Sequence, residues 1–193
     1  PQAIQVMLDP ADCGPATIAM SQDVQAEAYD YPEIFFEEKV HEIRRPHPDL
    51  NQIQAAAEKI KSSKQPIIIS GGGVLYSEAE QELSDFAKKH NIPVTSTVMG
   101  LGCMDNDDPY YIGNIGGLGD KSSNNLSKDT DLALAVGTKL ADFTTGSWSN
   151  FENDDFKLVS INTARYDVTK HRSTPVISDA KIAFQELSKA LGD

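Results

Sequence analysis

The sequence predicts a doubly wound α/β fold, a mostly parallel sheet with helices on both faces in a Rossmann-like three-layer αβα arrangement. Short apolar runs alternate with stretches of helical periodicity, which is the layout of parallel βαβ units. The runs 67–69 and 132–136 are apolar throughout. Strands buried on both faces have this composition, so both runs are expected in the middle of the sheet.

The elements can be placed in order from residue 49 onward. Asp49 is the expected N-cap of a first helix, because apolar residues follow it at i, i+3, i+4 and i+7. A strand at 67–70, a helix from Ala79 to about His90 and a strand at 93–96 come next. The later expected elements are a polar helix at 121–128, strands at 132–137, 156–161 and 175–177, and a closing helix at 183–191.

The chain is expected to have three parts. Residues 1–28 are predicted to be the C-terminal remnant of a preceding domain, with a strand at 15–20 after the Gly14-Pro15 turn. Residues 29–50 contain Arg45-Pro46-His47-Pro48 and are typical of a linker. Residues 51–193 form the predicted Rossmann-like central domain. A start at Pro1 suggests a piece of a longer protein.

Composition excludes several classes of partner. The 193 residues carry a formal net charge of −12, and Lys and Arg are scattered. Nucleic acids and anionic membrane surfaces both need a basic patch, so neither is expected as a partner. No apolar run approaches the roughly 18 residues that span a bilayer. Cys13 and Cys103 suggest neither a disulfide framework nor a metal site, and we expect a cytoplasmic protein.

A glycine turn follows the first predicted strand. Gly71, Gly72 and Gly73 could bring backbone N–H groups up to a phosphate, as in dinucleotide-binding folds. The third glycine of G-x-G-x-x-G is replaced by Tyr76, and no acidic residue ends the strand at 93–96. A standard NAD site is therefore not expected. A tight structural turn and an anion-binding turn both remain open.

Two further loops are candidate binding positions. Gly117 could contribute a second glycine loop to the same crevice, or belong to a flexible crossover. Gly137 and Thr138 follow the strand 132–136, and carboxyl ends of parallel strands are where ligands bind in such sheets. Asp142 could hydrogen-bond a ligand or cap a local turn. The predicted cofactor-binding residues are thus Gly71, Gly72, Gly73, Gly117, Gly137, Thr138 and Asp142.

No catalytic or metal-binding residues are predicted. The four histidines lack metal-ligand spacing, and no nucleophile–base pair stands out. Gly119-Asp120 followed by Asn124-Asn125 echoes the magnesium motif of thiamine diphosphate enzymes, but position 121 is Lys and the asparagines follow too soon. The run 105–108 lacks the glycine and glutamate of a calcium loop.

These motifs occur in an order that resembles the central domain of thiamine diphosphate enzymes such as acetolactate synthase. The matching strings are Gly71-Gly72-Gly73, Thr97–Gly102, Asp131–Asp142 and Ser178–Lys181. The stretch 22–32, with Phe35-Phe36 and Arg44-Arg45-Pro46, is more similar to the trihydroxycyclohexane-dione hydrolases of inositol catabolism. This resemblance implies a parent enzyme that opens a cyclic dione by C–C hydrolysis, with thiamine diphosphate and Mg²⁺ as cofactors and a homo-oligomeric state.

The resemblance also implies what the chain lacks. The family's activating Glu and its Gly-Asp-Gly motif belong to other domains, so the isolated chain is expected to be inactive and not to bind thiamine diphosphate. In acetolactate synthase relatives the central domain holds FAD, and in others ADP. Here Ile161-Asn162-Thr163-Ala164 replaces their acidic run.

Three hypotheses follow: a supporting domain of a hydrolase, a module that binds FAD or ADP, and a free-standing Rossmann oxidoreductase. The missing third glycine weighs against the last.

Overall fold

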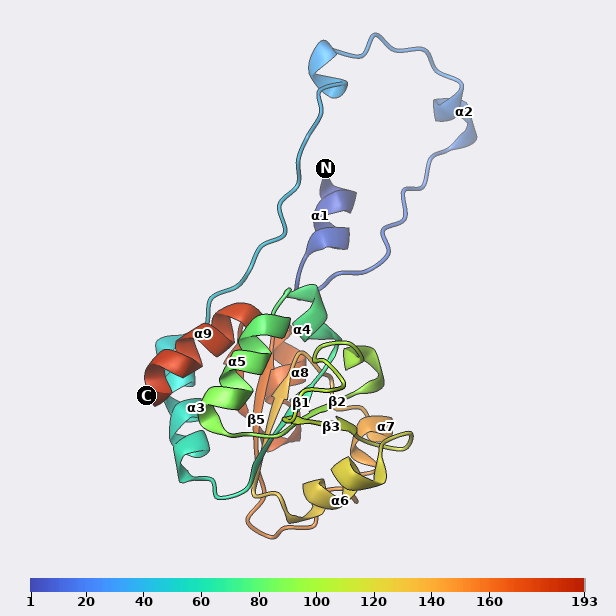
Figure 1. Cartoon of the computed structure of the whole chain (residues 1–193). Helices are drawn as coiled ribbons and strands as arrows, with labels where there is room; N and C mark the ends of the chain where they lie inside the picture. The colour runs from blue at the N-terminus through green and yellow to red at the C-terminus, as the bar shows by residue number, and fades with distance from the viewer. Residues whose placement is uncertain (193) are drawn as a thin grey trace. The chain divides into compact units, whose positions relative to one another are not determined.

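The computed structural model describes residues 1–192 and divides into two compact units, Pro1–Arg44 and a second that starts at Arg45. The second unit contains a six-stranded sheet in the order β3-β2-β1-β4-β5-β6, and every pairing is parallel (Figure 1). The prediction of a doubly wound parallel αβα fold is confirmed. The strands are β1 Pro66–Ser70, β2 Val94–Ser96, β3 Tyr111–Asn114, β4 Leu132–Val136, β5 Lys157–Asn162 and β6 Thr174–Ile177.

Seven α-helices accompany this sheet in the described part of the second unit. The expected first, second, polar and closing helices are all present, and three short ones occupy connections that the sequence pattern left irregular. Two 3₁₀ turns, Val98–Gly100 and Lys170–Arg172, complete these connections. The helices are α3 Leu50–Ser62, α4 Gly72–Tyr76, α5 Glu80–His90, α6 Lys121–Asp129, α7 Asp142–Thr145, α8 Arg165–Thr169 and α9 Ala180–Leu191.

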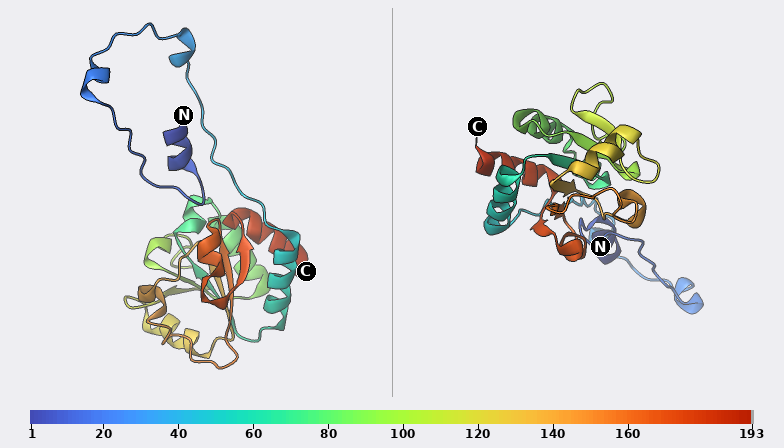
Figure 2. Two further views of the ribbon diagram at one scale, coloured as in Figure 1. Left: turned by 180° about the vertical axis from the view of Figure 1, so that it is seen from behind. Right: turned by 90° about the horizontal axis from the view of Figure 1, so that it is seen from below.

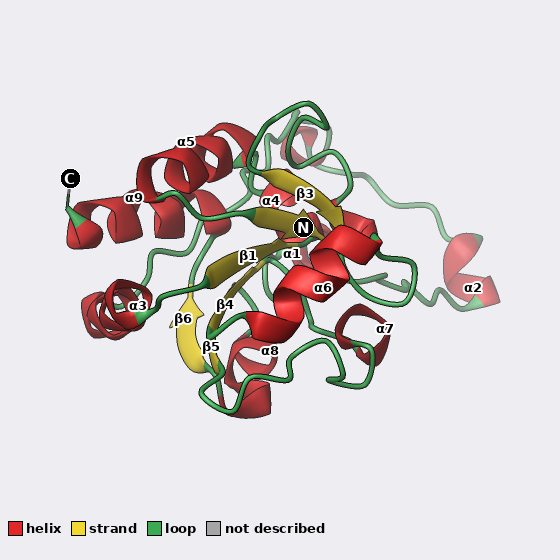
Figure 3. Cartoon of the chain, turned by 60° about the horizontal axis from the view of Figure 1, so that its bottom comes forward, coloured by secondary structure: helices red, strands yellow, loops and turns green. Residues whose placement is uncertain are grey.

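Alternate strand residues face opposite sides of the sheet, so the core consists of two apolar clusters, a larger one on one face and a smaller one on the other. Ile68 and Leu134, which are register partners, face the side where α3, α5 and α9 pack. Figure 2 shows α3 and α9, teal and red, side by side. Ile67 and Ile69 face the smaller cluster. Figure 3 shows α6 crossing the sheet opposite α3, α5 and α9.

Helix α6 is polar because it presents hydroxyl groups to the fold. Ser123 and Ser127 are its buried residues, and Leu126 is exposed. The Ser123 hydroxyl donates to the Asn114 carbonyl, and the Ser127 hydroxyl donates to the Asn124 carbonyl at 2.9 Å. These bonds satisfy the buried hydroxyl groups, so α6 can pack on the sheet although it has little apolar surface.

The first unit, residues 1–44, contains α1 Gln2–Leu8, α2 Gln22–Gln25 and a 3₁₀ turn at Glu33–Phe35. None of its side chains is buried. The strand expected at 15–20 is absent, and that stretch is extended coil. A strand needs a neighbour to pair its backbone groups, and this stretch has none among the described residues. Across those residues, no helix is long and apolar enough to cross a membrane.

Candidate functional site

The predicted binding residues follow strands β1, β3 and β4, whose carboxyl ends lie at one edge of the parallel sheet. Strand order reverses between β1 and β4, since β2 lies on the far side of β1. Ligands of open α/β sheets bind at this type of reversal. The carboxyl edge is therefore the candidate site.

The structure brings Gly71, Gly73, Gly137 and Thr138 together by direct backbone packing. A Cβ added to Gly71 would lie 2.4 Å from the Gly137 oxygen and 2.7 Å from Thr138 Cβ. A Cβ added to Gly73 would lie 2.5 Å from Gly137 Cα. All three distances are far shorter than a Cβ atom tolerates. Glycine is therefore needed for the two loops to touch, and Gly72 meets Met99 in a similar way, 3.0 Å from its oxygen.

Backbone partners already occupy the N–H groups of Gly71 and Gly73 in this turn. Gly71 donates to the Val136 carbonyl at 2.8 Å, Gly73 donates to Gly137 at 2.9 Å, and Gly137 donates to Ile161 at 2.8 Å. A phosphate cradle relies on such donors being free and on a helix N-terminus. Here they extend the sheet, and the helix that follows has five residues. The geometry does not fit a diphosphate group between these glycines and favours the structural turn.

Gly117 and Asp142 form a second group through Phe143. The Gly117 N–H donates to the Phe143 carbonyl at 2.9 Å, and a Cβ on Gly117 would lie 3.2 Å from the Phe143 ring. Asp142 opens α7, and its carbonyl accepts the N–H of Ser147 at 3.2 Å. Its side chain is exposed. Gly117 therefore packs against α7, and the Asp142 side chain faces solvent.

Two asparagines that sequence reasoning did not select brace this edge. Asn124 accepts from the Gly116 N–H at 2.9 Å and donates to the Gly116 carbonyl at 3.0 Å. Asn162 donates to the Thr138 carbonyl at 3.4 Å and accepts from Ala164 at 3.1 Å. The position of Asn162 at the end of β5 was the available signal, because an amide there can bond backbone on both sides. Asn124 lies within α6 and carried no such signal.

Exposed large apolar side chains follow five of the six strands at this edge, beside exposed charged residues such as Lys139 and Asp142. The apolar ones are Tyr76, Val98, Met99, Leu101, Leu118, Phe143 and Tyr166. Such side chains can contact an apolar or planar group or another protein surface.

The described residues include neither an activated nucleophile nor a cluster that could bind a metal ion. Burial raises the pKa of the Cys103 thiol, so it stays protonated at neutral pH. Burial and the neighbouring Lys170 lower the pKa of His171, whose ring contacts Trp148 at 4.7 Å. No group of three His, Cys, Asp or Glu in residues 1–192 could hold a metal ion. These residues therefore do not fit a magnesium–diphosphate site.

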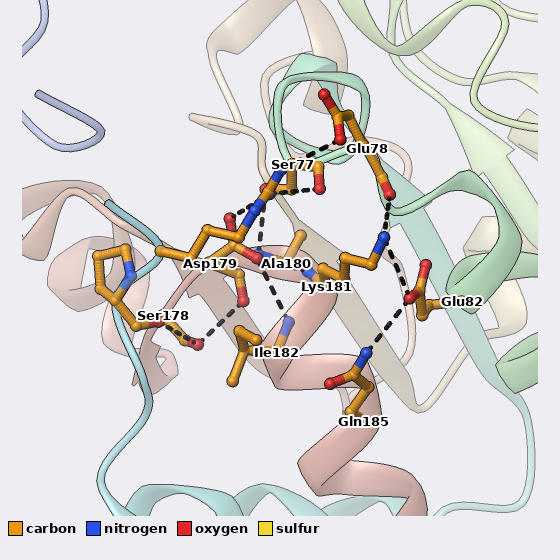
Figure 4. A network of polar contacts seen from close by, with 11 residues as sticks. Ser77, Glu78, Glu82, Ser178, Asp179, Ala180, Lys181, Ile182 and Gln185 are labelled. Carbon is orange, nitrogen blue, oxygen red and sulfur yellow. Dashed lines mark hydrogen bonds and ion pairs between the residues drawn. The ribbon is translucent and has the colours of Figure 1, made fainter. Parts of the chain in front are cut away.

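The end of α4 is held by a polar network around Asp179 (Figure 4). Asp179 caps α9 by accepting from the N–H groups of Lys181 at 3.0 Å and Ile182 at 3.3 Å. Arg45 donates to the Asp179 carboxylate at 3.1 Å and to the Ser77 carbonyl at 2.5 Å. The network ties the helix that follows the glycine turn to the start of the closing helix.

The sequence model described as thiamine pyrophosphate enzyme, central domain, matches residues 53–187. The chain belongs to this family. The resemblance predicted from the glycine turns is thus confirmed at the level of the family. The match includes all six strands, so the carboxyl edge described above belongs to the matched domain.

Three relatives of the chain are named 3D-(3,5/4)-trihydroxycyclohexane-1,2-dione hydrolase. The protein of Clostridium perfringens is 42% identical over 189 residues, which cover 98% of this chain and 30% of the relative. That of Clostridium tetani is 43% identical over 189 residues, covering 98% and 29%. That of Geobacillus thermodenitrificans is 40% identical over 191 residues, covering 99% and 30%. The chain thus spans less than a third of their length.

A solved structure supports the fold. The X-ray structure of a protein assigned as a thiamin diphosphate-dependent enzyme from Mycobacterium smegmatis superposes with a TM-score of 0.63. The two sequences are 19% identical, and the match covers 80% of this chain and 30% of the other. At this identity the likeness concerns the fold alone.

Proposed function

We propose that the chain is the central domain of a longer, thiamine diphosphate-dependent hydrolase of inositol catabolism. The intact enzyme cleaves a C–C bond of 3D-(3,5/4)-trihydroxycyclohexane-1,2-dione and releases 5-deoxy-glucuronate. The observation that carries this proposal is the 42% identity to a relative of that name over 98% of the chain. The alignment covers 189 of the 193 residues and so includes nearly all of residues 1–44, which extends the likeness beyond the Rossmann-like unit.

The role proposed for this chain within the enzyme is structural. The described residues offer neither an activated nucleophile nor a metal cluster. Thiamine diphosphate and Mg²⁺ are therefore assigned to other domains, and the partners of this chain to other domains and subunits of a cytoplasmic homo-oligomer. We propose the domain boundaries 1–28, 29–50 and 51–193 for its remnant, linker and central parts.

A direct assay tests the activity. The intact enzyme and the 193-residue chain are each incubated with the dione, thiamine diphosphate and Mg²⁺, and 5-deoxy-glucuronate is measured. We expect product from the intact enzyme and none from the chain alone. An intact enzyme that leaves the dione unchanged but joins or decarboxylates 2-oxo acids would instead support an acetolactate synthase-like enzyme.

Nucleotide binding by the central domain stays a prediction. The residues predicted to hold FAD or ADP are the three glycines at 71–73 with Gly117, Gly137, Thr138 and Asp142. The N–H groups of Gly71 and Gly73 already donate to backbone carbonyls, which does not favour a diphosphate at the glycine turn. Calorimetry with FAD, ADP and thiamine diphosphate tests the prediction. We expect no heat from thiamine diphosphate. Heat at micromolar FAD or ADP would favour the binding-module alternative.

A further inference from the structure

The N-terminal unit has apolar side chains without a core to bury them. Residues 1–44 expose twelve large apolar side chains, whereas residues 45–192 expose nine over more than three times the length. Solvated apolar side chains at this density are unusual for a surface that has no partner. The twelve are Val6, Met7, Ile18, Met20, Val24, Tyr29, Tyr31, Ile34, Phe35, Phe36, Val40 and Ile43.

Four aromatic rings within this set pack on one another, and we call them the aromatic cluster: Tyr29, Tyr31, Phe35 and Phe36. Ring centroids are 5.3 Å apart for Tyr29–Tyr31, 4.8 Å for Tyr31–Phe35 and 5.3 Å for Phe35–Phe36. Despite these contacts each side chain is 55% to 73% exposed. Each ring thus contacts a neighbouring ring while much of its surface meets water.

Local backbone structure orders the Phe35 and Phe36 part of the cluster before any partner binds. The Phe35 N–H donates to the Pro32 carbonyl at 2.9 Å, and the Phe36 N–H donates to Glu33 at 3.0 Å, which closes the 3₁₀ turn. Proline also limits the backbone freedom of the unfolded segment. Rings that are already ordered lose little freedom when a partner covers them, and Tyr and Phe are typical anchors of interface cores.

The charge around the cluster indicates what covers it. Residues 27–42 contain six acidic side chains and one basic side chain, Lys39, which gives a net charge of −5. Two copies of the same segment would repel each other, and the chain as a whole carries −12. The complementary surface is therefore an apolar hollow rimmed by Lys and Arg. The acidic residues are Glu27, Asp30, Glu33, Glu37, Glu38 and Glu42.

We propose that the aromatic cluster is a docking surface for the part of the intact enzyme that lies outside residues 1–193. The inference rests on the proposed function. Relatives align with 98% and 99% of this chain, aromatic segment included, and about two thirds of their length or more lies outside the aligned part. We assign the complementary folded surface to that remainder.

Cysteine accessibility tests the proposal. In a Cys13→Ser background, which leaves the buried Cys103, Phe35→Cys and the matched control Glu38→Cys are made in the 193-residue chain and in the intact enzyme. Maleimide labelling rates are compared. We expect Phe35→Cys to react at least tenfold more slowly in the intact enzyme, and Glu38→Cys, at the rim, to change less than threefold. Hydroxyl-radical oxidation of the unsubstituted rings, read by mass spectrometry, provides the same comparison without a substitution.

Two outcomes would overturn the proposal. Equal labelling and equal oxidation of the cluster in both proteins would mean that nothing covers it. Protection in the 193-residue chain that increases with its concentration would assign the surface to a second copy. Neither outcome depends on turnover of the dione, so a failure of the docking surface is distinguishable from a failure of the proposed activity.

Discussion

Gly137 lies where the loops after β1 and β4 meet backbone to backbone. Its φ of +61° is in the left-handed region, and a Cβ there would lie 2.5 Å from Gly73 Cα. Gly102 also has a positive φ, +90°, but has open space around it. Comparing substitutions at Gly137 and Gly102 therefore separates the cost of backbone strain from the cost of steric overlap.

We expect Gly137→Ala to lower the free energy of unfolding by about 3–5 kcal/mol, because strain and overpacking add. Gly102→Ala should lose about 1–2 kcal/mol, from strain alone. Urea titrations of both variants measure the difference. Equal losses would mean that the loops separate without penalty and that their close approach is not required.

His90 is expected to make the fold sensitive to mild acid. Burial, and next the charge of Lys89, lower its pKa from 6.5, and its Nε2 atom has no hydrogen-bond partner. The folded state therefore binds fewer protons than the unfolded state, so stability is full above about pH 6.5 and falls below it. His90→Gln should flatten the loss of stability between pH 7 and pH 5 in thermal melts. The exposed His47→Gln is the control, and an equal effect from it would contradict the assignment.

Among the elements, those with strong periodicity could be predicted and those with a polar or glycine-rich sequence could not. Helix α3 and strand β4 fall where the apolar pattern indicates. Strand β3 was missed because Gly113 and Asn114 disfavour strands, and pairing with β2 overrides that preference. Helix α4, which starts inside the glycine turn at Gly72, was not predicted, because the sequence indicates only the later helix from about Ala79. Its position depends on close packing with Gly137, which no local pattern encodes.

The candidate site was predicted in location but not in its contacts. Chain order and the carboxyl-edge rule suffice to place Thr138 and Asp142 at the edge. The bonded N–H groups of Gly71 and Gly73 depend on pairing with a strand that is more than sixty residues away in the sequence. Whether the N–H groups of a glycine turn are free for a ligand or bonded to other backbone therefore depends on tertiary contacts, which the local sequence does not reveal.

The two aspartate N-caps provide a matched test at the element scale. Asp49 caps α3 through one bond to Asn51 at 2.8 Å and is exposed. Asp179 caps α9, contacts Arg45 and is 4% exposed. We expect Asp49→Ala to lose about 1 kcal/mol and Asp179→Ala about 2–4 kcal/mol, because Asp179 accepts two cap bonds and also a charged hydrogen bond from Arg45.

Asp179→Asn, which keeps an oxygen acceptor for the cap, should lose less than Asp179→Ala. Denaturant titrations compare the three variants. A loss for Asp179→Ala no larger than that for Asp49→Ala would show that the contact with Arg45 adds nothing to stability.

At the scale of the whole molecule, the second unit is expected to fold without the first. No side chain of residues 1–44 is buried, while the sheet and both apolar clusters belong to residues 45–192. Deletion of residues 1–44 should therefore change the free energy of unfolding by less than about 0.5 kcal/mol, the range of ordinary surface changes. Urea unfolding of both forms gives the comparison. A drop of several kcal/mol would mean that the first unit contributes to the core.

The closing helix α9 runs alongside α3, with both starts at one edge of the sheet and both ends at the other. Near their starts, the Asp179 N–H donates to the Pro46 carbonyl at 2.9 Å. Near their ends, Lys61 donates to the Ala190 carbonyl at 2.9 Å. The polypeptide enters this unit at the carboxyl edge and leaves α9 at the amino edge. Twelve helical residues separate the two points by about 18 Å. The unit thus acts as a rigid spacer, which would set the distance between whatever precedes residue 45 and whatever follows residue 191.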